Sequence, residues 1–169
     1  FDLSGRVAII TGSTKGIGKA IAARMCQHGA KVVISSRKAD ACEAVTAEIN
    51  RDFAANGGEA ISIPAHVGIE DELRNLVDKT LDKWGKITTL VPNAAANPYY
   101  GPSAEMPDSA FEKIWEVNVK SVFKLCHMVL PGMVEAGSGS ITIIASNSGL
   151  KGSVELCGYA ISKVAEHQI

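Results

Sequence analysis

Three polar side chains near the end of the chain have the types and the spacing of a proton-transfer site. Tyr159 and Lys163 stand four residues apart, and Ser146 precedes Tyr159 by thirteen residues. Residues four apart on a helix share a face, so the phenol and the ammonium would face a common ligand. A nearby positive charge favours the phenolate form of a tyrosine, and a serine hydroxyl can donate to a substrate oxygen. Together the three residues predict proton exchange with a carbonyl or an alcohol.

A glycine-rich turn near the start of the chain predicts a second site. Residues 11–18 have the sequence TGSTKGIG and follow the apolar run 7–10. Glycine supports the tight turn, the close approach of phosphate oxygens and the packing of the next helix on the sheet, and that helix offers unpaired N–H groups to a pyrophosphate. The pattern therefore predicts a dinucleotide site. The cofactor-binding residues expected from the turn are Gly12, Ser13, Thr14, Lys15, Gly16, Ile17 and Gly18.

The end of the second predicted strand distinguishes the two nicotinamide dinucleotides. An NAD site places a carboxylate there for the ribose 2′-hydroxyl. This chain has Ser36, Arg37 and Lys38, with no carboxylate until Asp40. A guanidinium binds a 2′-phosphate with two charge-assisted hydrogen bonds, and Lys15 projects toward the same region. We therefore predict NADP(H) rather than NAD(H); the alternative is that these cations are solvated residues at the start of a helix.

The elements that must position these residues follow from the hydrophobic pattern. Strands are predicted at 6–11, 31–35, 60–64, 88–91 and 140–145, and helices at 17–28, 39–55, 70–84, 108–135 and from about 158, with a break in the fourth helix near 131–132. Apolar strands that are each followed by a helix predict an α/β fold, a doubly wound parallel sheet covered on both faces. In such a sheet ligands bind beyond the carboxyl ends of the strands, where the polar residues named above fall.

Length and composition limit the classes of protein that are compatible with these interpretations. The chain has 169 residues, 46% apolar and 21% charged, as expected of a single soluble domain at 1–169. A net charge of −1 gives no reason to expect nucleic acid or an anionic membrane as a partner. The four cysteines have no metal-ligand spacing, so we predict no metal site and free thiols in a reducing compartment. We expect a cytoplasmic protein, or a peroxisomal one if the source is eukaryotic, although terminal signals are not readable in this chain.

Taken together, these residues resemble the short-chain dehydrogenase/reductase family, from the glycine turn to the Tyr-x-x-x-Lys helix. The resemblance implies a Rossmann-type fold with Tyr159 as the general acid/base and Lys163 as the residue that activates it and binds the nicotinamide ribose. Ser146 would polarise the carbonyl, and Asn118 would hold a water in a proton relay. The segment that begins with Asn93 and Ala94 matches the family's Asn-Asn-Ala-Gly motif, in which Asn93 would brace the sheet and the backbone would lie near the adenosine ribose.

Three segments, 35–38, 66–68 and 93–101, resemble the branch that contains NADP(H)-dependent carbonyl and retinal reductases. His66 and Val67 stand where the family commonly has an Asp-Val pair that contacts adenine. The family also continues past the catalytic helix into two further strands and a helical flap, a C-terminal substrate lobe missing from this chain. Because the chain starts at Phe1 and stops at Ile169 inside a predicted helix, we expect it to be part of a longer polypeptide.

The sequence thus predicts an oxidoreductase that transfers a hydride between NADP(H) and a carbonyl or secondary alcohol. Two alternatives stay open: a reductase of 3-oxoacyl thioesters with the same four catalytic residues, and a non-catalytic NADP(H)-binding subunit or fragment. Residues 97–100 and 150–156 would line a moderately hydrophobic substrate pocket. By resemblance, the long helix and the catalytic helix would pack against partner subunits, often in a homotetramer.

Overall fold

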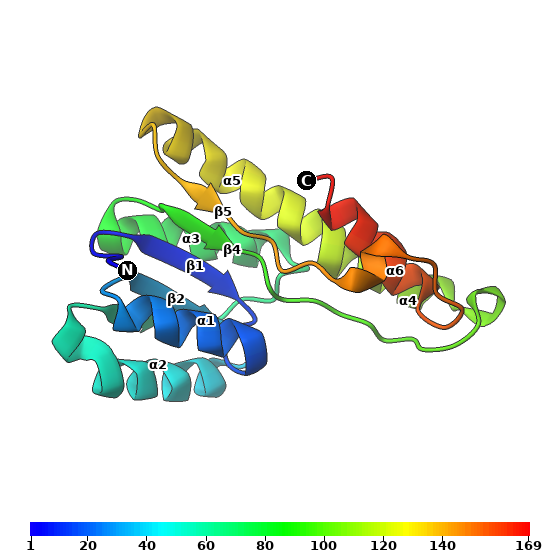
Figure 1. Cartoon of the computed structure of the whole chain (residues 1–169), viewed down its shortest axis with the longest axis horizontal. Helices are drawn as coiled ribbons and strands as arrows, with labels where there is room; N and C mark the ends of the chain where they lie inside the picture. Colours follow the sequence, from blue (N-terminus) through cyan, green and yellow to red (C-terminus); the bar gives the residue numbers. More distant parts are fainter.

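A parallel sheet with the strand order β3-β2-β1-β4-β5 forms the centre of the molecule (Figure 1). The computed structural model describes residues 1–169, except for the side chain of residue 54. The strands are β1 (Val7–Thr11), β2 (Lys31–Ser35), β3 (Glu59–Ser62), β4 (Thr89–Val91) and β5 (Ser140–Ile141). The chain runs outward from β1 to β3 and then crosses to the opposite side of β1 for β4 and β5. This reversal confirms the predicted doubly wound α/β fold and places a topological switch point between β1 and β4.

Helices cover both faces of this sheet. They are α1 (Gly16–Gln27), α2 (Ala39–Phe53), α3 (Glu70–Trp84), α4 (Asp108–Ile114), α5 (Ser121–Glu135) and α6 (Cys157–Glu166), with short helical segments η1 (Ala54–Asn56), η2 (Ser103–Glu105), η3 (Trp115–Lys120) and η4 (Asn147–Leu150). Side chains alternate between the two faces of a strand. In β1, therefore, Ile10 packs in the core beneath α1 and α2, whereas Ile9 packs in the core beneath α3 and α5. Among the helices that the structure describes, none is both long and apolar enough to cross a membrane.

The long helix predicted at 108–135 consists of three segments. A π-helical turn, η3, separates α4 from α5, and α5 continues through Pro131 to Glu135. The predicted break near 131–132 is therefore wrong. Proline removes one N–H donor from the helix, but Val129 and Met133 on either side are both buried in the core and hold α5 in place. The actual irregularity, a π-turn, is a feature often found at functional sites.

The edge strand β5 is shorter than the predicted 140–145, but its pairing with β4 goes further. Thr142 N donates to Leu90 O and Ile144 N to Pro92 O, both at 2.9 Å. Pro92 can sit here because its carbonyl, and not an N–H, is needed on this side. Residues 142–145 therefore extend beyond β5 and lead from the sheet directly to Ser146.

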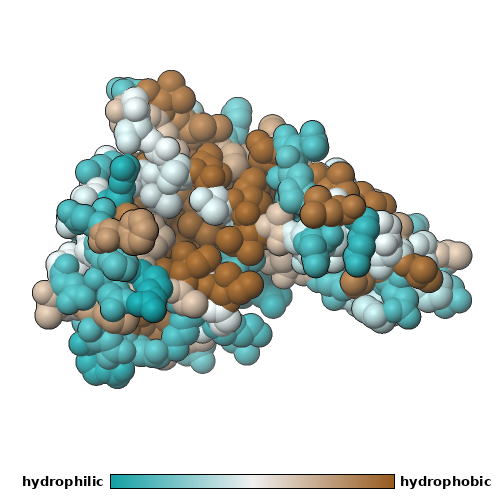
Figure 2. Space-filling view, in the orientation of Figure 1, coloured by the Kyte–Doolittle hydropathy of each residue, from teal (hydrophilic) through white to brown (hydrophobic). Residues whose placement is uncertain are grey.

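Figure 2 shows that apolar side chains gather in the middle of the face that is seen in Figure 1.

Candidate active site

The glycine turn is packed tightly on one side and open on the other. Gly12 has a φ of +66°, which favours glycine, and a Cβ on Gly18 would lie 2.6 Å from both Asn93 Nδ2 and the Gly12 carbonyl. A side chain at Gly18 would therefore push α1 away from the turn. Gly16, by contrast, has nothing within 4 Å of an added Cβ. The turn thus presents its open side at the start of α1, where helix N–H groups attract anions.

Hydrogen bonds from the end of β4 brace this turn. Asn93 Nδ2 donates to Thr11 O at 2.9 Å and to Gly12 O at 3.2 Å. The Thr11 hydroxyl accepts from the backbone N of Asn93 and of Ala94, each at 3.0 Å. Sequence reasoning assigned no role to Thr11, although a buried hydroxyl at the end of a strand needs partners. The Asn93 contacts agree with the bracing role that the sequence resemblance implied.

Ser13 differs from its neighbours in the turn because its side chain is directed into the protein. It is completely buried, donates through Oγ to Ile10 O at 2.7 Å and accepts from Ser35 N at 2.8 Å. The Ser13 hydroxyl therefore ties the end of β1 to the end of β2. Ile17, in the same turn, is in contrast 62% exposed to solvent.

A cleft of about 660 Å³ opens at the carboxyl ends of the strands. The predicted site residues that line it are Gly12, Thr14, Lys15, Gly16, Ser36, Arg37, Lys38, His66, Val67, Asn93 and Ala94. Lys113 of α4 also lines it, and among the described lining residues none is Asp or Glu. The cleft is therefore bordered by four cationic side chains, an arrangement that attracts an anionic ligand.

His66 is held in place within this cleft. Its backbone N donates to Glu72 Oε2 at 2.6 Å, and its ring Nδ1 accepts from Gly68 N at 3.0 Å. The neutral ring then carries its proton on Nε2. The Nε2–H of His66 is therefore a hydrogen-bond donor, whereas the aspartate that the family commonly has at this position would be an acceptor.

The side chains of Tyr159 and Lys163 lie on the same side of α6, as their spacing predicts. The Lys163 Nζ lies 5.5 Å from the centroid of the Tyr159 ring, and Lys163 is buried. Its ammonium donates to Glu166 Oε1 at 2.7 Å and Oε2 at 2.8 Å, and to Ile144 O at 3.2 Å. Burial raises the pKa of the Glu166 carboxyl, while Lys163 and His167 act in the opposite direction. Sequence reasoning missed Glu166, although its position three residues after Lys163 on a helix was a usable signal.

Asn118 connects α6 to the cleft. Its side chain is completely buried in η3; Oδ1 accepts from Ala96 N at 2.8 Å, and Nδ2 donates to Ala96 O at 3.0 Å and to Ser162 Oγ at 2.9 Å. Ser162 Oγ in turn donates to Tyr159 O at 2.7 Å. Both amide hydrogens of Asn118 are thus used within the protein, so neither is free for the relay water that the resemblance implies.

Ser146 lies at the start of η4, where its Oγ accepts from Ser148 N at 3.1 Å. Gly149 lets η4 pack closely on α6, because a Cβ there would lie 2.8 Å from the Lys163 carbonyl carbon. Ser146, Asn118, Tyr159 and Lys163 are not among the described residues that line the cleft. Of the predicted cofactor residues, the cleft lining therefore includes those named above but not Ser13, Ile17, Gly18, Tyr159 and Lys163. Asn118 joins this cleft to α6.

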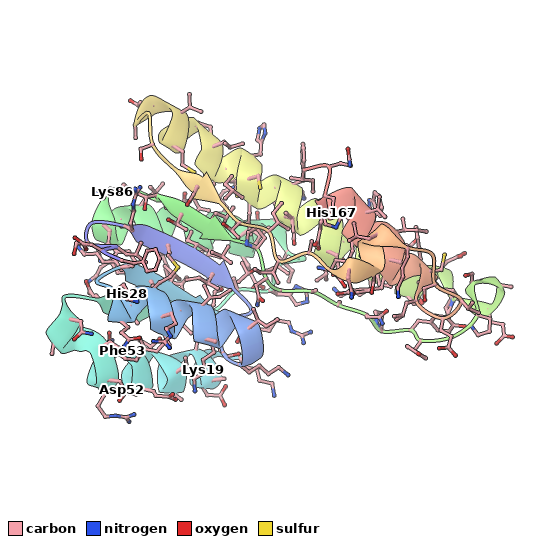
Figure 3. All side chains as sticks on the ribbon, in the orientation of Figure 1. Lys19, His28, Asp52, Phe53, Lys86 and His167 are labelled. Carbon is pink, nitrogen blue, oxygen red and sulfur yellow. The ribbon has the colours of Figure 1, made fainter. Side chains whose placement is uncertain are left out.

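Some other polar side chains take no part in this site. Figure 3 shows His28 and Lys86 at the amino-terminal edge of the sheet, at the opposite end from α6. Lys19 of α1 is paired with Glu48 of α2 at 2.8 Å, which ties the two helices together. The carboxyl ends of the strands are thus where the candidate chemistry gathers.

Comparison with known proteins defines the class. Residues 6–169 match the family model for short chain dehydrogenases, so the chain belongs to the short-chain dehydrogenase/reductase family. It is 39% identical over 160 residues to dehydrogenase/reductase SDR family member 4 of Caenorhabditis elegans, covering 94% of this chain and 60% of the relative. It is also 39% identical over 161 residues to tropinone reductase-like 3 of Erythroxylum coca, covering 95% of this chain and 60% of the relative.

Solved structures show the same fold. A 7α-hydroxysteroid dehydrogenase in complex with NADH and 7-oxo glycochenodeoxycholic acid is 36% identical, with a TM-score of 0.89 over 99% of this chain and 64% of its own. A metagenomic short-chain oxidoreductase in complex with NADP is 32% identical, with a TM-score of 0.90 over 98% of this chain and 73% of its own. The chain spans about 60% of the length of the curated relatives that it matches.

Proposed function

We propose that the protein transfers a hydride between NADP(H) and a carbonyl or secondary-alcohol substrate, with Tyr159 as the general acid/base. The observation that carries this proposal is the buried connection from Ala96 through Asn118 to Ser162. Ala96 lines the cleft, and Ser162 lies on α6 between Tyr159 and Lys163. The connection would therefore hold Tyr159 and Lys163, the proposed proton-transfer pair, in a fixed position relative to the cleft.

Several properties of the cleft support a nicotinamide dinucleotide phosphate as its ligand. Its volume of about 660 Å³ lies in the range of cofactor sites, and Gly16 leaves open space at the start of α1 for a pyrophosphate. Lys15, Arg37 and Lys38 would bind the 2′-phosphate, and all three are exposed at the edge of the cleft. When bound, NADP(H) supplies or accepts the hydride. The absence of Asp and Glu from the described lining residues supports NADP(H) over NAD(H).

The remaining chemistry falls to side chains of this chain. The Tyr159 phenol donates a proton to the carbonyl oxygen in reduction, and the Tyr159 phenolate accepts a proton from the hydroxyl in oxidation, a role that contributes typically 10²–10⁴-fold in rate. The Lys163 ammonium beside the ring favours the phenolate. The Ser146 hydroxyl donates to the substrate oxygen and orients it. Asn118 fixes α6 in this proposal, because its side-chain amide is bonded to Ala96 and Ser162.

Substrate class and assembly are part of the same proposal. Leu150 and Val154 are 76% and 81% exposed, and Tyr100 is 67% exposed, as befits one wall of a moderately hydrophobic substrate pocket. Phe123 of α5 and Val164 of α6 are exposed apolar side chains on the helices proposed to pack in a homo-oligomer, a tetramer by family resemblance. The cysteines are free, which is consistent with the cytoplasm as the proposed location.

Removal of the Tyr159 hydroxyl tests the proposal. We expect Tyr159→Phe to lower kcat/KM for NADPH-dependent reduction by about 10²–10⁴-fold while NADPH binding, followed by its fluorescence, is retained. The assay is NADPH oxidation against a panel of ketones, aldehydes and 3-oxoacyl thioesters. Ser138→Ala, which removes an exposed hydroxyl between α5 and β5, is the control. Full activity in Tyr159→Phe would contradict the assignment. A wild type that binds NADPH but turns over none of the panel would instead support a binding subunit.

Reversal of the charge at Arg37 tests the cofactor preference. We expect Arg37→Glu to lower kcat/KM for NADPH by about 10–100-fold, because each hydrogen bond to a charged group is worth about 1.5–3 kcal/mol. Arg51→Glu, on an exposed side chain at the far end of α2, is the control and should change little. A wild type with higher kcat/KM for NADH than for NADPH would refute the preference.

A further inference from the structure

A carboxylate that the proposed mechanism does not use lies against the lysine that it does use. Both oxygens of Glu166 accept from the Lys163 Nζ, at 2.7 and 2.8 Å, and each of the two side chains is 2% exposed. An ammonium has three donors, and the third bond goes to Ile144 O at 3.2 Å. All three N–H donors of the Lys163 ammonium are therefore hydrogen-bonded to acceptors within the protein.

This arrangement changes what Tyr159 experiences. A lone ammonium at 5.5 Å from the centroid of the phenol ring would act with its full positive charge. An ammonium paired with a buried carboxylate acts as a dipole, and its effect on the phenol is smaller and depends on where Glu166 holds it. A glutamine amide oxygen at position 166 could still accept a hydrogen bond from the Lys163 ammonium, as Ile144 O does, so the lysine keeps polar partners when the carboxylate charge is removed.

We propose that Glu166 is a positioning residue of the active site, which fixes the Lys163 ammonium and sets how much of its charge reaches Tyr159. The inference rests on the proposed function, because it assigns Tyr159 and Lys163 the proton-transfer roles. It extends that function by one residue and by one property, the pH at which the phenol can act as a base.

The other charged groups near this pair are few. Those that act on Glu166 are Lys163 and His167, and His167 follows α6 at its exposed end (Figure 3). The segments packed against α6 are η4, η3 and α4. Of these, η4 has no titratable side chain, and the charged residues of the other two are Asp108, Glu112, Lys113, Glu116 and Lys120. Glu116 is already paired with Lys113 at 3.5 Å. Glu166 is therefore the acidic side chain in direct contact with Lys163 among the described ion pairs.

The experiment compares Glu166→Gln with Glu166→Asp in the direction of alcohol oxidation. Gln keeps the shape and removes the charge, so the phenol would face an uncompensated ammonium. We expect the midpoint of the pH profile of kcat/KM to fall by about one pH unit in Glu166→Gln. In Glu166→Asp, which retains the charge, the midpoint should stay within about 0.3 units of wild type. Glu135→Gln, on an exposed glutamate at the end of α5, is the control and should leave the midpoint unchanged.

An active Glu166→Gln variant whose midpoint stays in place or rises would overturn the inference, because a merely structural residue would change the rate without lowering the midpoint. If Glu166→Gln is recovered only unfolded, the double variant Lys163→Met/Glu166→Gln decides. The double variant should fold, since it removes both charges together. An unfolded double variant would refute the explanation that Glu166→Gln unfolds because it leaves the Lys163 charge unpaired.

Failure of the proposed function would look different. In that case the wild type would show no turnover with the panel, and the ion pair would be tested by denaturation alone. The double variant should then lose less stability than the sum of Lys163→Met and Glu166→Gln, because each single variant leaves a buried charge unpaired. Additive losses would refute the role of Glu166 even in a protein without turnover.

Discussion

The buried asparagine Asn118 provides a sharp test of how α6, the proposed catalytic helix, is held. Asn118→Ala removes three hydrogen bonds, two to the backbone of Ala96 and one to Ser162 Oγ. A typical hydrogen bond contributes about 1 kcal/mol net, so the direct loss is about 3 kcal/mol. Ser162 keeps its bond to Tyr159 O, and Ala96 is only half-buried, so water can satisfy part of what is left. We therefore expect the free energy of unfolding to fall by about 2–4 kcal/mol.

Urea denaturation followed by circular dichroism measures this loss, with the slope of the transition checked for constancy. Asn75→Ala, at an exposed position on α3, is the matched control and should change stability by less than about 0.5 kcal/mol. NADPH titration of the folded variant should also show weaker binding, because Ala96 lines the cleft. A loss below about 1 kcal/mol for Asn118→Ala would refute the reasoning, since the three bonds would then contribute less than a single typical one.

Two further predictions concern the turn and the sheet edge. Gly18→Ala should cost about 1–3 kcal/mol of unfolding free energy, because its Cβ would lie 2.6 Å from atoms of the facing turn; Gly132→Ala in α5, where an added Cβ meets nothing within 4 Å, should instead be neutral or stabilise by up to about 1 kcal/mol. Burial works to raise the pKa of Glu59, but hydrogen bonds from Lys83 and Trp84 outweigh it and hold the pKa below its usual 4.5. The stability that this carboxylate contributes is present above pH 4.5 and lost as the pH falls below it. Denaturation at pH 7 and pH 4 should therefore show a smaller acid-induced loss in Glu59→Gln, and an equal loss would contradict this reading.

Local patterns predicted most of the elements that position the site. The strand at 31–35 and the helix at 70–84 have the predicted bounds, because an apolar run and an acidic first turn are properties of neighbouring residues. The break in the long helix was misplaced for the same reason. Pro131 is a strong local signal, but burial of the residues around it preserved α5, and the π-turn at Asn118 has no comparable signature in the sequence.

The sequence by itself determined the class of fold, the glycine turn and the pairing of Tyr159 with Lys163 on one helical face, since each depends on residues close together in the chain. Tertiary structure alone decided the partners of buried polar groups. Asn118 bonds to Ala96 across 22 residues of chain and to Ser162 across 44. Such partners are chosen only when packing removes water and each donor must find an acceptor that the fold has brought near. The same requirement placed Glu166 against Lys163. The three-residue spacing allows this contact on a helix, and burial makes it necessary because a buried charge needs a partner.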